Sequence, residues 1–551
     1  MSFDLLLRDF PSFATAPNSI HKVRELILKL ALLGKLKTQD STDEPASKQL
    51  ERIAKDLGKS AAIQEHTKDS SSLHNLPERW VPAKLGELVG PSTERVEPSR
   101  AKELPYIGLE HIEKSTGRLL TRGSSTQVKS TKSRFYAGDL LYGRLRPYLN
   151  KVLVAEFDGI CSTDILVFSK NRNLSNRYLA MLFLSHDFVN YASQNVTGIN
   201  HPRVSFKTLS RFPLFLPPFA EQLRIVDKLD KLMALCDELE AMQQAEKSGC
   251  IRLSTALLTA LQNATNAADL TRFWSLVSQH FDSLFDCQEN INALRKAVLQ
   301  LAIRGKLVSH YSTEDTKSEL SYRLPEQPIK QFTLEVPQHS PADLLTSSDF
   351  PAGWILARIG DIALFVGSGI TPRGGKSNYF STGIPFIRSQ NVLVNKLKLD
   401  DVSYITKEQH EIMSRTKVHP GDVLLNITGA SIGRSSPVPE NFSEANVNQH
   451  VCIIRPSSII SHRFLAFYLN SSFGQAQIFA IQSGATREGL NYNQVRSLIV
   501  PIPPLVEQKS IVSKLDNFMT LCDQLETKIE EGRKISELFS ESVVKASLAE
   551  P

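Results

Sequence analysis

The sequence is poor in cysteine, tryptophan and long apolar runs. It has 6 cysteines and 3 tryptophans among 551 residues, and no cysteine stands in a Cys-x-x-Cys pair. This scarcity argues against a zinc site and a disulfide framework, and it predicts reduced, buried thiols in a cytoplasmic protein. No apolar run reaches membrane-spanning length, and the first residues (Asp4, Arg8, Asp9) do not form a basic region followed by an apolar one. We therefore expect neither a membrane span nor a signal peptide.

A complete catalytic motif is also lacking. Phe365–Gly369 has the Phe-x-Gly-x-Gly spacing of S-adenosylmethionine-binding methyltransferases, but Pro372 follows where that motif needs a helix. The two Pro-Pro pairs are preceded by Leu216 and Ile502, where a methyltransferase needs a polar residue for the target amine. A phosphate loop at Lys376 lacks its glycine six residues earlier. Histidines show no metal-ligand spacing and no triad order. We expect no catalytic, cofactor-binding or metal-binding residues in this chain.

What the sequence does contain is a long internal duplication. Residues 217–240 and 503–526, offset by 286, agree at 15 of 24 positions. Residues 28–36 and 299–307, offset by 271, share a Gly-Lys-Leu ending. Because the offset changes so little along the chain, a unit of roughly 270 residues occurs twice.

Each copy of Pro-Pro-x-x-Glu-Gln closes an extended run and opens a helix, since proline blocks a preceding helix but suits a first helical turn. Apolar residues then recur at alternating steps of four and three, which predicts a seam for a partner helix. We expect helices 219–263 and 288–307 to pack together, and the helix in residues 3–36 to lie near the C-terminal one. The seam residues are Ile225, Leu229, Leu232 and Leu239 in the first copy and Ile511, Leu515, Phe518 and Leu525 in the second.

The predicted fold class is α+β. Two α/β globes are joined by long antiparallel helices that form a coiled-coil-like spacer, and the duplication implies pseudo-two-fold symmetry. Strands are expected at 165–168 and 451–454, and helices at 46–57, 178–191 and 464–481. The predicted segments are an N-terminal helical segment and linker (1–75), a first globe (76–216), central helices (217–307), a linker (308–349), a second globe (350–502) and a C-terminal helix (503–551).

The charge is divided unevenly between globes and helices. Residues 76–216 hold 20 Lys and Arg against 12 Asp and Glu, and residues 350–503 hold 14 against 9. Since the whole chain is only +6, the remaining residues sum to −7. Basic globes on an acidic frame favour binding of a polyanion by the globes, with a merely solvated basic face as the alternative.

Polar, donor-rich loops stand at corresponding places in both globes. Arg, Asn and Gln read base edges, while Lys, Ser and Thr mostly hold phosphates, so we predict DNA contacts from these loops. The candidates in the first globe are Lys129, Lys132, Arg134, Arg144, Arg146, Tyr148, Asn150, Lys151, Asn200, His201 and Arg203. Those in the second are Thr371, Arg373, Lys376, Arg388, Gln390, Asn391, Arg415, Lys417, Asn426, Thr428, Ser431, Arg434, Asn448, Gln449 and Arg487.

The whole pattern resembles the specificity subunit of Type I restriction-modification systems. The resemblance covers nearly all of the chain. It lies in the repeated Pro-Pro…Glu-Gln…Ile-Val…Leu-Asp…Leu-Cys-Asp…Leu-Glu helices, the two Gly-Lys-Leu helices, and the Pro-x-x-Trp openings at 77–80 and 351–354. The N-terminal extension before the first globe is present in only some members of that family.

The resemblance implies two target-recognition domains, each reading one half of a split, asymmetric site in double-stranded DNA. It further implies that the helices dock two methyltransferase (modification) subunits and, through them, restriction/translocase subunits. Such a complex would act as a DNA adenine methyltransferase and an ATP-dependent deoxyribonuclease. S-adenosylmethionine, ATP and Mg²⁺ would belong to the partner subunits, and this chain would hold no cofactor.

Two other functions fit part of the pattern. A stand-alone, sequence-specific DNA-binding regulator with two internal repeats would use the same basic loops, although such regulators are usually symmetric homodimers. A scaffold that binds only proteins would use the helices and leave the basic globes unexplained.

Overall fold

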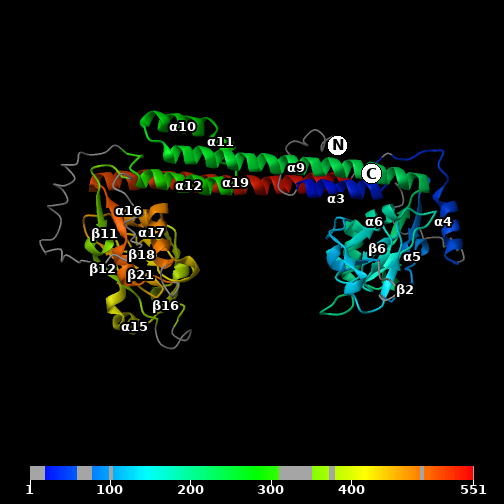
Figure 1. The fold of residues 1–551 in the computed structure, drawn as a ribbon, viewed down its shortest axis with the longest axis horizontal. Coiled ribbons are helices and arrows are strands. Elements are labelled where there is room, and N and C mark those ends of the chain that lie inside the picture. Colours follow the sequence, from blue (N-terminus) through cyan, green and yellow to red (C-terminus); the bar gives the residue numbers. More distant parts are fainter. Residues whose placement is uncertain are drawn as a thin grey trace. The chain divides into compact units, whose positions relative to one another are not determined.

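The computed structural model describes residues 19–36, 38–58, 77–97, 104–308, 350–371, 379–483 and 489–549. The chain divides into two compact units, Met1–Glu246 with Gly532–Pro551, and Lys247–Glu531 (Figure 1). Each unit contains one globe of mixed helix and strand together with helical segments, and the predicted α+β class is confirmed. The candidates Arg373, Lys376 and Arg487 and most of the predicted linkers lie outside the described residues.

The first unit begins with α3 (Ser19–Leu32) and α4 (Ala46–Asp56). Its globe contains β1 (Val81–Lys84), α5 (Leu85–Leu88), β2 (Arg95–Val96), β3 (Pro105–Ile107), η3 (Leu109–His111), β4 (Gly123–Ser124), η4 (Ser125–Gln127), β5 (Lys132–Phe135), β6 (Leu140–Gly143), η5 (Pro147–Leu149), β7 (Val152–Val154), β8 (Gly159–Cys161), β9 (Ile165–Phe168), α6 (Asn176–Leu184), α7 (His186–Gln194), α8 (Phe206–Leu209) and β10 (Pro213–Leu216). The helix α9 (Phe219–Asn263) follows at once.

The second unit takes the end of α9 and continues with α10 (Ala267–Gln279), α11 (Phe281–Leu284) and α12 (Gln288–Ile303). Its globe contains β11 (Ile355–Arg358), α14 (Ile359–Ile362), β12 (Ala363–Ser368), β13 (Ile384–Ile387), η9 (Ser389–Asn391), β14 (Val392–Leu393), β15 (Lys396–Leu397), β16 (Ser403–Ile405), α15 (Lys407–Ile412), η10 (Ser414–Thr416), β17 (Lys417–Val418), β18 (Val423–Asn426), η11 (Gly429–Ser431), β19 (Ser435–Pro437), β20 (Ala445–Val447), β21 (Val451–Pro456), α16 (His462–Asn470), α17 (Ser472–Ser483), α18 (Tyr492–Ser497) and β22 (Ile499–Ile502). The helix α19 (Leu505–Ala549) ends it and returns to the first unit.

The two globes share most of their sheet topology, and each adds one edge strand that the other lacks, β2 in the first and β12 in the second. The first has a sheet of order β2-β5-β8-β3-β4 beside β7-β6-β9, and the second has β17-β20-β13-β16 beside β12-β21-β18-β19. In each globe one central pair, β3 with β8 or β13 with β20, is parallel, and the other pairs are antiparallel. The duplication read from the sequence is therefore a duplication of fold, and the strands expected at 165–168 and 451–454 are confirmed.

In each globe the first and last strands lie side by side. Its first strand pairs antiparallel with its last, with Val81 opposite Leu216 in the first globe and Ile355 opposite Ile502 in the second. The last strand then runs directly into the double proline and the long helix. The entry and exit of each globe are therefore fastened to one another at the start of a long helix.

The helices expected at 178–191 and 464–481 were predicted wrongly, because each is two helices separated by one serine. The Ser185 hydroxyl donates to the Leu182 carbonyl at 2.6 Å and accepts from the Phe188 amide at 3.3 Å. It thereby ends α6 and begins α7. Ser471 makes the same pair of bonds in the second globe, with Tyr468 and Gly474. Continuous apolar residues on both sides hide this break in the sequence.

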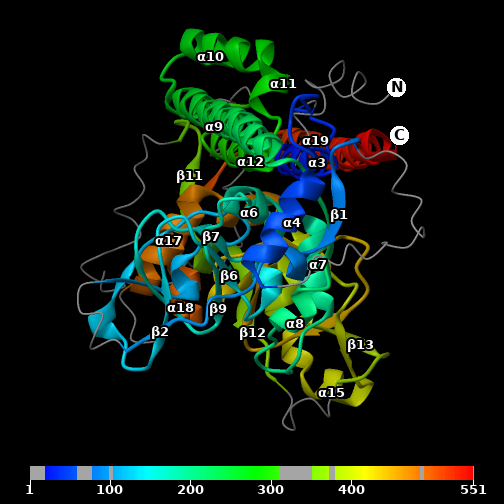
Figure 2. The same ribbon diagram turned by 90° about the vertical axis from the view of Figure 1, so that its right-hand side faces the viewer.

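In both long helices the residues of the expected seam pack against other apolar residues. Ile225 and Leu229 of α9 are buried among apolar residues of α3, and Ile511 and Leu515 of α19 are buried in a cluster that includes α12. Leu232, Leu239, Phe518 and Leu525 are partly buried against the same clusters. Figure 2 shows α3 and α12 nearly end-on, close to the long helices.

The shorter seam helices end as their sequence predicts. Gly34 and Gly305 have φ of +70° and +74°, the left-handed conformation that glycine adopts without strain. The following lysine amides donate back to the carbonyls of Leu30 and Leu301, both at 2.9 Å. This is the Schellman arrangement, which satisfies carbonyl groups at a helix end.

The repeated glutamate fastens each globe to its long helix. Trp80 donates its indole N–H to Glu221 at 2.9 Å, and Trp354 donates to Glu507 at 3.0 Å. Both carboxylates are buried. Burial raises the pKa of Glu221 above its usual value, because removal from water disfavours the charged form, although the Trp80 and Thr38 donors oppose this shift. The identical Trp and Glu residues in the two copies are thus one contact made twice.

The repeated glutamine has an equally specific role. The Gln222 side chain accepts from the Ser175 amide at 3.0 Å and donates to the Pro217 carbonyl at 2.9 Å. Gln508 does the same with Ser461 at 2.7 Å and Pro503 at 2.8 Å. Each glutamine therefore ties the double-proline turn to the first residues before helix α6 or α16.

Arginines bind the repeated acidic residues further along the long helices. In the first unit Arg24 of α3 binds Asp237 at 2.6 Å and Glu240 at 2.8 Å. The second unit repeats this with Arg295 of α12, which binds Asp523 at 2.6 Å and Glu526 at 3.0 Å. These pairs lie beside the apolar seam and fix the register of each short helix on its long one.

Candidate nucleic-acid interface

Three loops of the first globe meet at one junction. The Arg144 amide, just after β6, donates to the Asp164 carbonyl at 2.9 Å, in the turn between β8 and β9. The Arg144 carbonyl in turn accepts from the Val204 amide at 3.0 Å, and the Arg146 amide donates to the Pro202 carbonyl at 2.7 Å. These backbone bonds bring the predicted segments 144–151 and 198–203 side by side.

The second globe builds the same junction from different side chains. Ile427, just after β18, donates its amide to the His450 carbonyl at 3.0 Å and accepts from the Leu490 amide at 2.8 Å. A bridge between Thr428 and Gly489 corresponds to one between residues 145 and 203 in the first globe. The polar loops that the sequence placed at matching positions are therefore matched in space within each globe.

The junctions differ in how they obtain two left-handed residues. In the second globe the positions are Gly429 and Gly433, with φ of +76° and +85°. In the first globe they are Arg146 and Asn150, with φ of +51° and +43°. A residue with a Cβ carries a cost of about 1 kcal/mol or more in this region, and such strain gathers at functional sites. The arginine is thus kept where glycine would fit the backbone better.

The half-buried carboxylate of Asp164 positions two arginines of the first junction. Arg203 binds the two oxygens of Asp164 at 2.8 Å and 3.2 Å, and Arg144 approaches one of them at 3.6 Å. The hydrogen bonds from Arg203, with the positive charge of both guanidinium groups, lower the pKa of Asp164 below its usual value. Arg203 and Arg144 therefore hold the loops in place, and Arg146 is left exposed at their edge.

Exposure divides the eleven candidates of the first globe. Lys151 is not a surface donor, because its ammonium group donates to the carbonyls of Leu109 at 2.6 Å and Ile112 at 2.9 Å. The Asn150 side chain is buried, and the half-buried Arg134 lies over the Tyr136 ring at 4.9 Å. Lys132, Arg144 and Arg203 are also half-buried, and the exposed candidates are Lys129, Arg146, Tyr148, Asn200 and His201.

The second globe divides in the same way. Asn426 donates to the Ser389 carbonyl at 2.9 Å and Asn391 to the Lys398 carbonyl at 3.0 Å, so these two buried amides hold loops together. Asn448 is buried too. Half-buried candidates are Thr371, Arg388, Lys417, Thr428 and Ser431, and the exposed ones are Gln390, Arg415, Arg434 and Gln449.

One exposed residue at the first junction is absent from the sequence-based set. Ile199 lies between Gly198 and Asn200, and its side chain is 99% exposed. The set was chosen for hydrogen-bond donors and acceptors, so an apolar residue inside the same loop was passed over. Its place between a glycine and an asparagine was the available signal.

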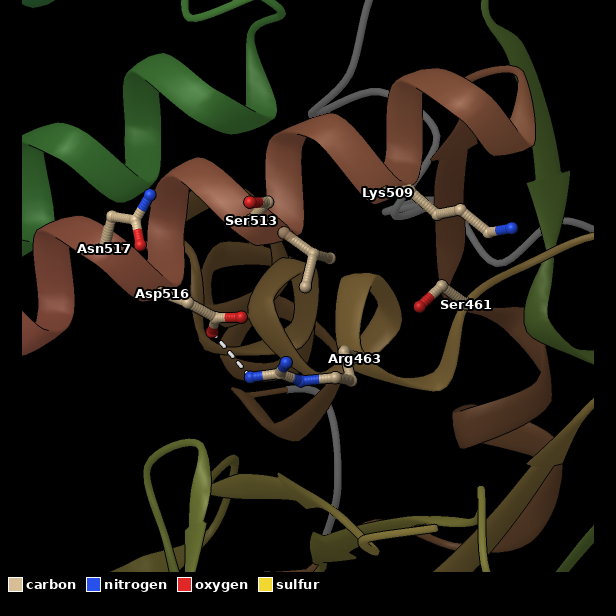
Figure 3. A pocket seen from close by; sticks show the side chains of 7 residues that line it. Ser461, Arg463, Lys509, Ser513, Asp516 and Asn517 are labelled. Atoms are coloured by element: carbon tan, nitrogen blue, oxygen red, sulfur yellow. Dashed lines mark hydrogen bonds and ion pairs between the residues drawn. The ribbon is translucent and has the colours of Figure 1, made fainter.

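The groove in Figure 3 shows how the second globe sits on its long helix. Ser461 and Arg463 of the globe face Lys509 and Asp516 of α19, and Arg463 binds Asp516 at 2.5 Å. The first unit has the matching pair between Arg177 and Asp230 at 2.7 Å. The groove therefore lies at the contact between a globe and its long helix. Its side chains do not form the nucleophile–base pair that a catalytic site would need.

The described residues contain no cluster of three or more His, Cys, Asp or Glu side chains suited to a metal ion. All six cysteines are free thiols, four of them buried. The stretch Phe365–Gly369 lies mainly in the strand β12, so its glycines do not open a helix as a methyltransferase loop requires. Among the described helices none is long and apolar enough to cross a membrane.

Sequence comparison accounts for both units at once. Residues 77–247 and 351–532 each match the family described as the Type I restriction modification DNA specificity domain. The chain belongs to this family. Each match in the specificity chain takes in one globe and the first part of the long helix that follows, so the resemblance read from the sequence is confirmed.

Relatives of the specificity chain align over nearly its full length. The Type I restriction enzyme EcoEI specificity subunit of Escherichia coli is 26% identical over 565 residues, covering 96% of this chain and 94% of that protein. The EcoAI specificity subunit of Escherichia coli is 26% identical over 557 residues, with the same coverage. A solved chain from a study of complex assembly and conformational transition of the type I R-M system has a TM-score of 0.52 at 19% identity, covering 86% of this chain and 98% of that one. That likeness supports the fold.

Proposed function

We propose that this specificity chain reads a bipartite, asymmetric site in double-stranded DNA and docks methyltransferase subunits, and through them restriction subunits. The observation that carries the proposal is the three-loop junction, which occurs in both globes with two matching backbone hydrogen bonds and different side chains. A backbone frame common to both globes, with different exposed donors in each, is what two readers of different half-sites require.

The side chains at matching positions predict different half-site sequences. The first junction presents Arg146 where the second has Gly429, and Asp164 where the second has His450. A guanidinium group pairs bidentately with guanine, whereas a glycine reads nothing. The two halves of the target should therefore not be copies of one another.

The long helices supply surfaces for partner subunits. Outside its seam, α9 exposes Leu235, Met242 and Leu253, and α19 exposes Leu521, Ile535 and Leu538. Exposed apolar residues on otherwise charged helices are typical of protein-binding surfaces. We assign S-adenosylmethionine, ATP and Mg²⁺ to the partner subunits, and no cofactor to this chain.

The test is to co-express the chain with methyltransferase subunits from its own genome and map methylated adenines in the host DNA. We expect one split motif with an unmethylated, unspecified gap. Arg146→Ala should relax the preference in one half only, and Arg434→Ala in the other half only. Arg172→Ala, which removes an exposed arginine of the first globe outside the junction, should leave both halves unchanged. A single continuous motif would contradict two-domain reading, and assembly without any DNA binding would favour a protein-only scaffold.

A further inference from the structure

The loop that follows α7 in the first globe is a closed and well-anchored projection. Thr197 and Arg203 exchange backbone hydrogen bonds at 2.8 Å and 2.9 Å, enclosing five residues. Gly198 turns the chain with φ of +91°. The Pro202 carbonyl accepts from the Arg146 amide, and the Arg203 side chain is held by Asp164. The loop backbone is thus fixed by contacts that do not involve the side chain of residue 199.

An isoleucine occupies the outer part of this loop. Ile199 is 99% exposed, which is the highest value among the exposed large apolar residues of the described chain. Single exposed apolar residues are common on protein surfaces, so exposure by itself means little. Here, however, the isoleucine adjoins the exposed Asn200 and His201, and its loop is bonded to the strained Arg146. At this exposure the side chain of Ile199 does not pack against any part of the chain that the structure describes.

We propose that Ile199 contacts the apolar surface of DNA bases in the half-site read by the first globe. The inference rests on the proposed function and extends it to a residue that cannot form hydrogen bonds. Two base surfaces have the required chemistry, the C5-methyl group of thymine in the major groove and the face of an unstacked base step. Arg146, Asn200 and His201 would supply polar contacts around it.

The surroundings favour DNA over a protein partner. The first globe has 20 basic against 12 acidic residues. Apolar protein-binding surfaces are expected to gather several large residues, as on α9, whereas Ile199 stands among polar and basic neighbours. An isolated apolar contact ringed by donors matches base readout.

The first test compares Ile199→Ala with Leu120→Ala in the full chain assembled with its methyltransferase subunits. Leu120 is an exposed leucine of the same globe, outside the junction. We expect Ile199→Ala to weaken binding to the methylation-mapped site about tenfold, while binding to unrelated DNA and the salt dependence of binding stay unchanged, because no charge is lost. Leu120→Ala should match the wild type in all three measurements. Since Ile199 is exposed, neither change should impair folding.

The second test separates the two base surfaces. Deoxyuridine replaces each thymine of the half-site in turn, which removes only the methyl group. If one replacement weakens the wild type and has no further effect on Ile199→Ala, the contact is to that methyl group. If no replacement matters but 2-aminopurine in the half-site brightens with the wild type and not with the variant, Ile199 enters an unstacked step.

The outcomes that overturn the inference are distinct from those that overturn the function. Equal specific affinity of wild type and Ile199→Ala would refute the role of Ile199 and leave the function intact. So would a loss of methyltransferase assembly in the variant with DNA binding retained. Absence of specific DNA binding by the assembled wild type would refute the proposed function itself.

Discussion

Replacement of Arg146 by glycine should separate stability from DNA recognition. Arg146 has φ of +51°, a conformation that costs a residue with a Cβ about 1–2 kcal/mol. Glycine removes this cost but adds about 0.5–1 kcal/mol of backbone entropy to the unfolded chain. The Arg146→Gly chain should therefore be as stable as the wild type or more stable by up to about 1.5 kcal/mol. Gly429, with φ of +76° at the matching position, shows that the fold accepts glycine there.

The control is Arg172→Gly, at an exposed arginine that does not have a positive φ. There glycine brings only its entropic cost, so stability should fall by about 0.5–1 kcal/mol. Urea titration followed by tryptophan fluorescence measures both changes, since Trp80 is buried in the first globe.

DNA binding by the Arg146→Gly chain should weaken, although the stability of the chain does not fall. Loss of a guanidinium–guanine pair costs about 1–3 kcal/mol of discrimination, so Arg146→Gly should weaken specific binding roughly tenfold or more. If Arg146→Gly destabilises the chain as much as Arg172→Gly, the backbone strain is not real. If it stabilises the chain and leaves DNA affinity intact, the strain is not maintained for recognition.

Three further outcomes are expected. Glu221 has a raised pKa, so its ionisation opposes folding as pH rises above the usual glutamate range. Glu221→Gln keeps one side-chain oxygen to accept from Trp80 and cannot ionise, so it should remove that part of the pH dependence in urea titrations between pH 4 and 8; an identical pH dependence in the two chains would contradict this. Leu229→Asp places a carboxylate in the buried seam and should lower the free energy of unfolding by several kcal/mol, whereas Met242→Asp, on the same helix but 60% exposed, should not. Size-exclusion chromatography and urea titration compare the two variants, and equal behaviour would contradict the seam. Insertion of one heptad after Glu246 in α9 and another after Gly532 in α19 lengthens each helix by about 10.5 Å. The gap in the methylated motif should then widen by about three base pairs while both half-sequences stay unchanged, and a constant gap would show that the helices do not set its length.

The helices were predictable because their signals are local. The spacing of Ile225, Leu229 and Leu232 follows helical geometry whatever the rest of the chain does. Gly34 and Gly305 mark helix ends for an equally local reason, since only glycine adopts left-handed φ freely. Duplication strengthened each signal by presenting it twice.

The site was predictable only as a set of loops. Lys151 looked like a phosphate contact, but its ammonium group is held by carbonyls about forty residues away in sequence. Asn426 looked like a base reader and instead joins a distant loop. Such pairings depend on tertiary contacts that no spacing pattern encodes. Ile199 was missed for the converse reason, since its exposure depends on how the loop is closed.

The pairing of each globe's first and last strands has an evolutionary consequence. The span from Ile355 to Ile502 is twelve residues longer than that from Val81 to Leu216, yet the strand pairs at the two ends have the same register. Extra residues are thus absorbed inside the globe, and the start of the long helix does not move. A lineage could lengthen, trim or replace either globe by recombination at these strands while the Trp–Glu contacts and the helical seams stay intact. Selection on what is read would then be uncoupled from selection on how the chain assembles.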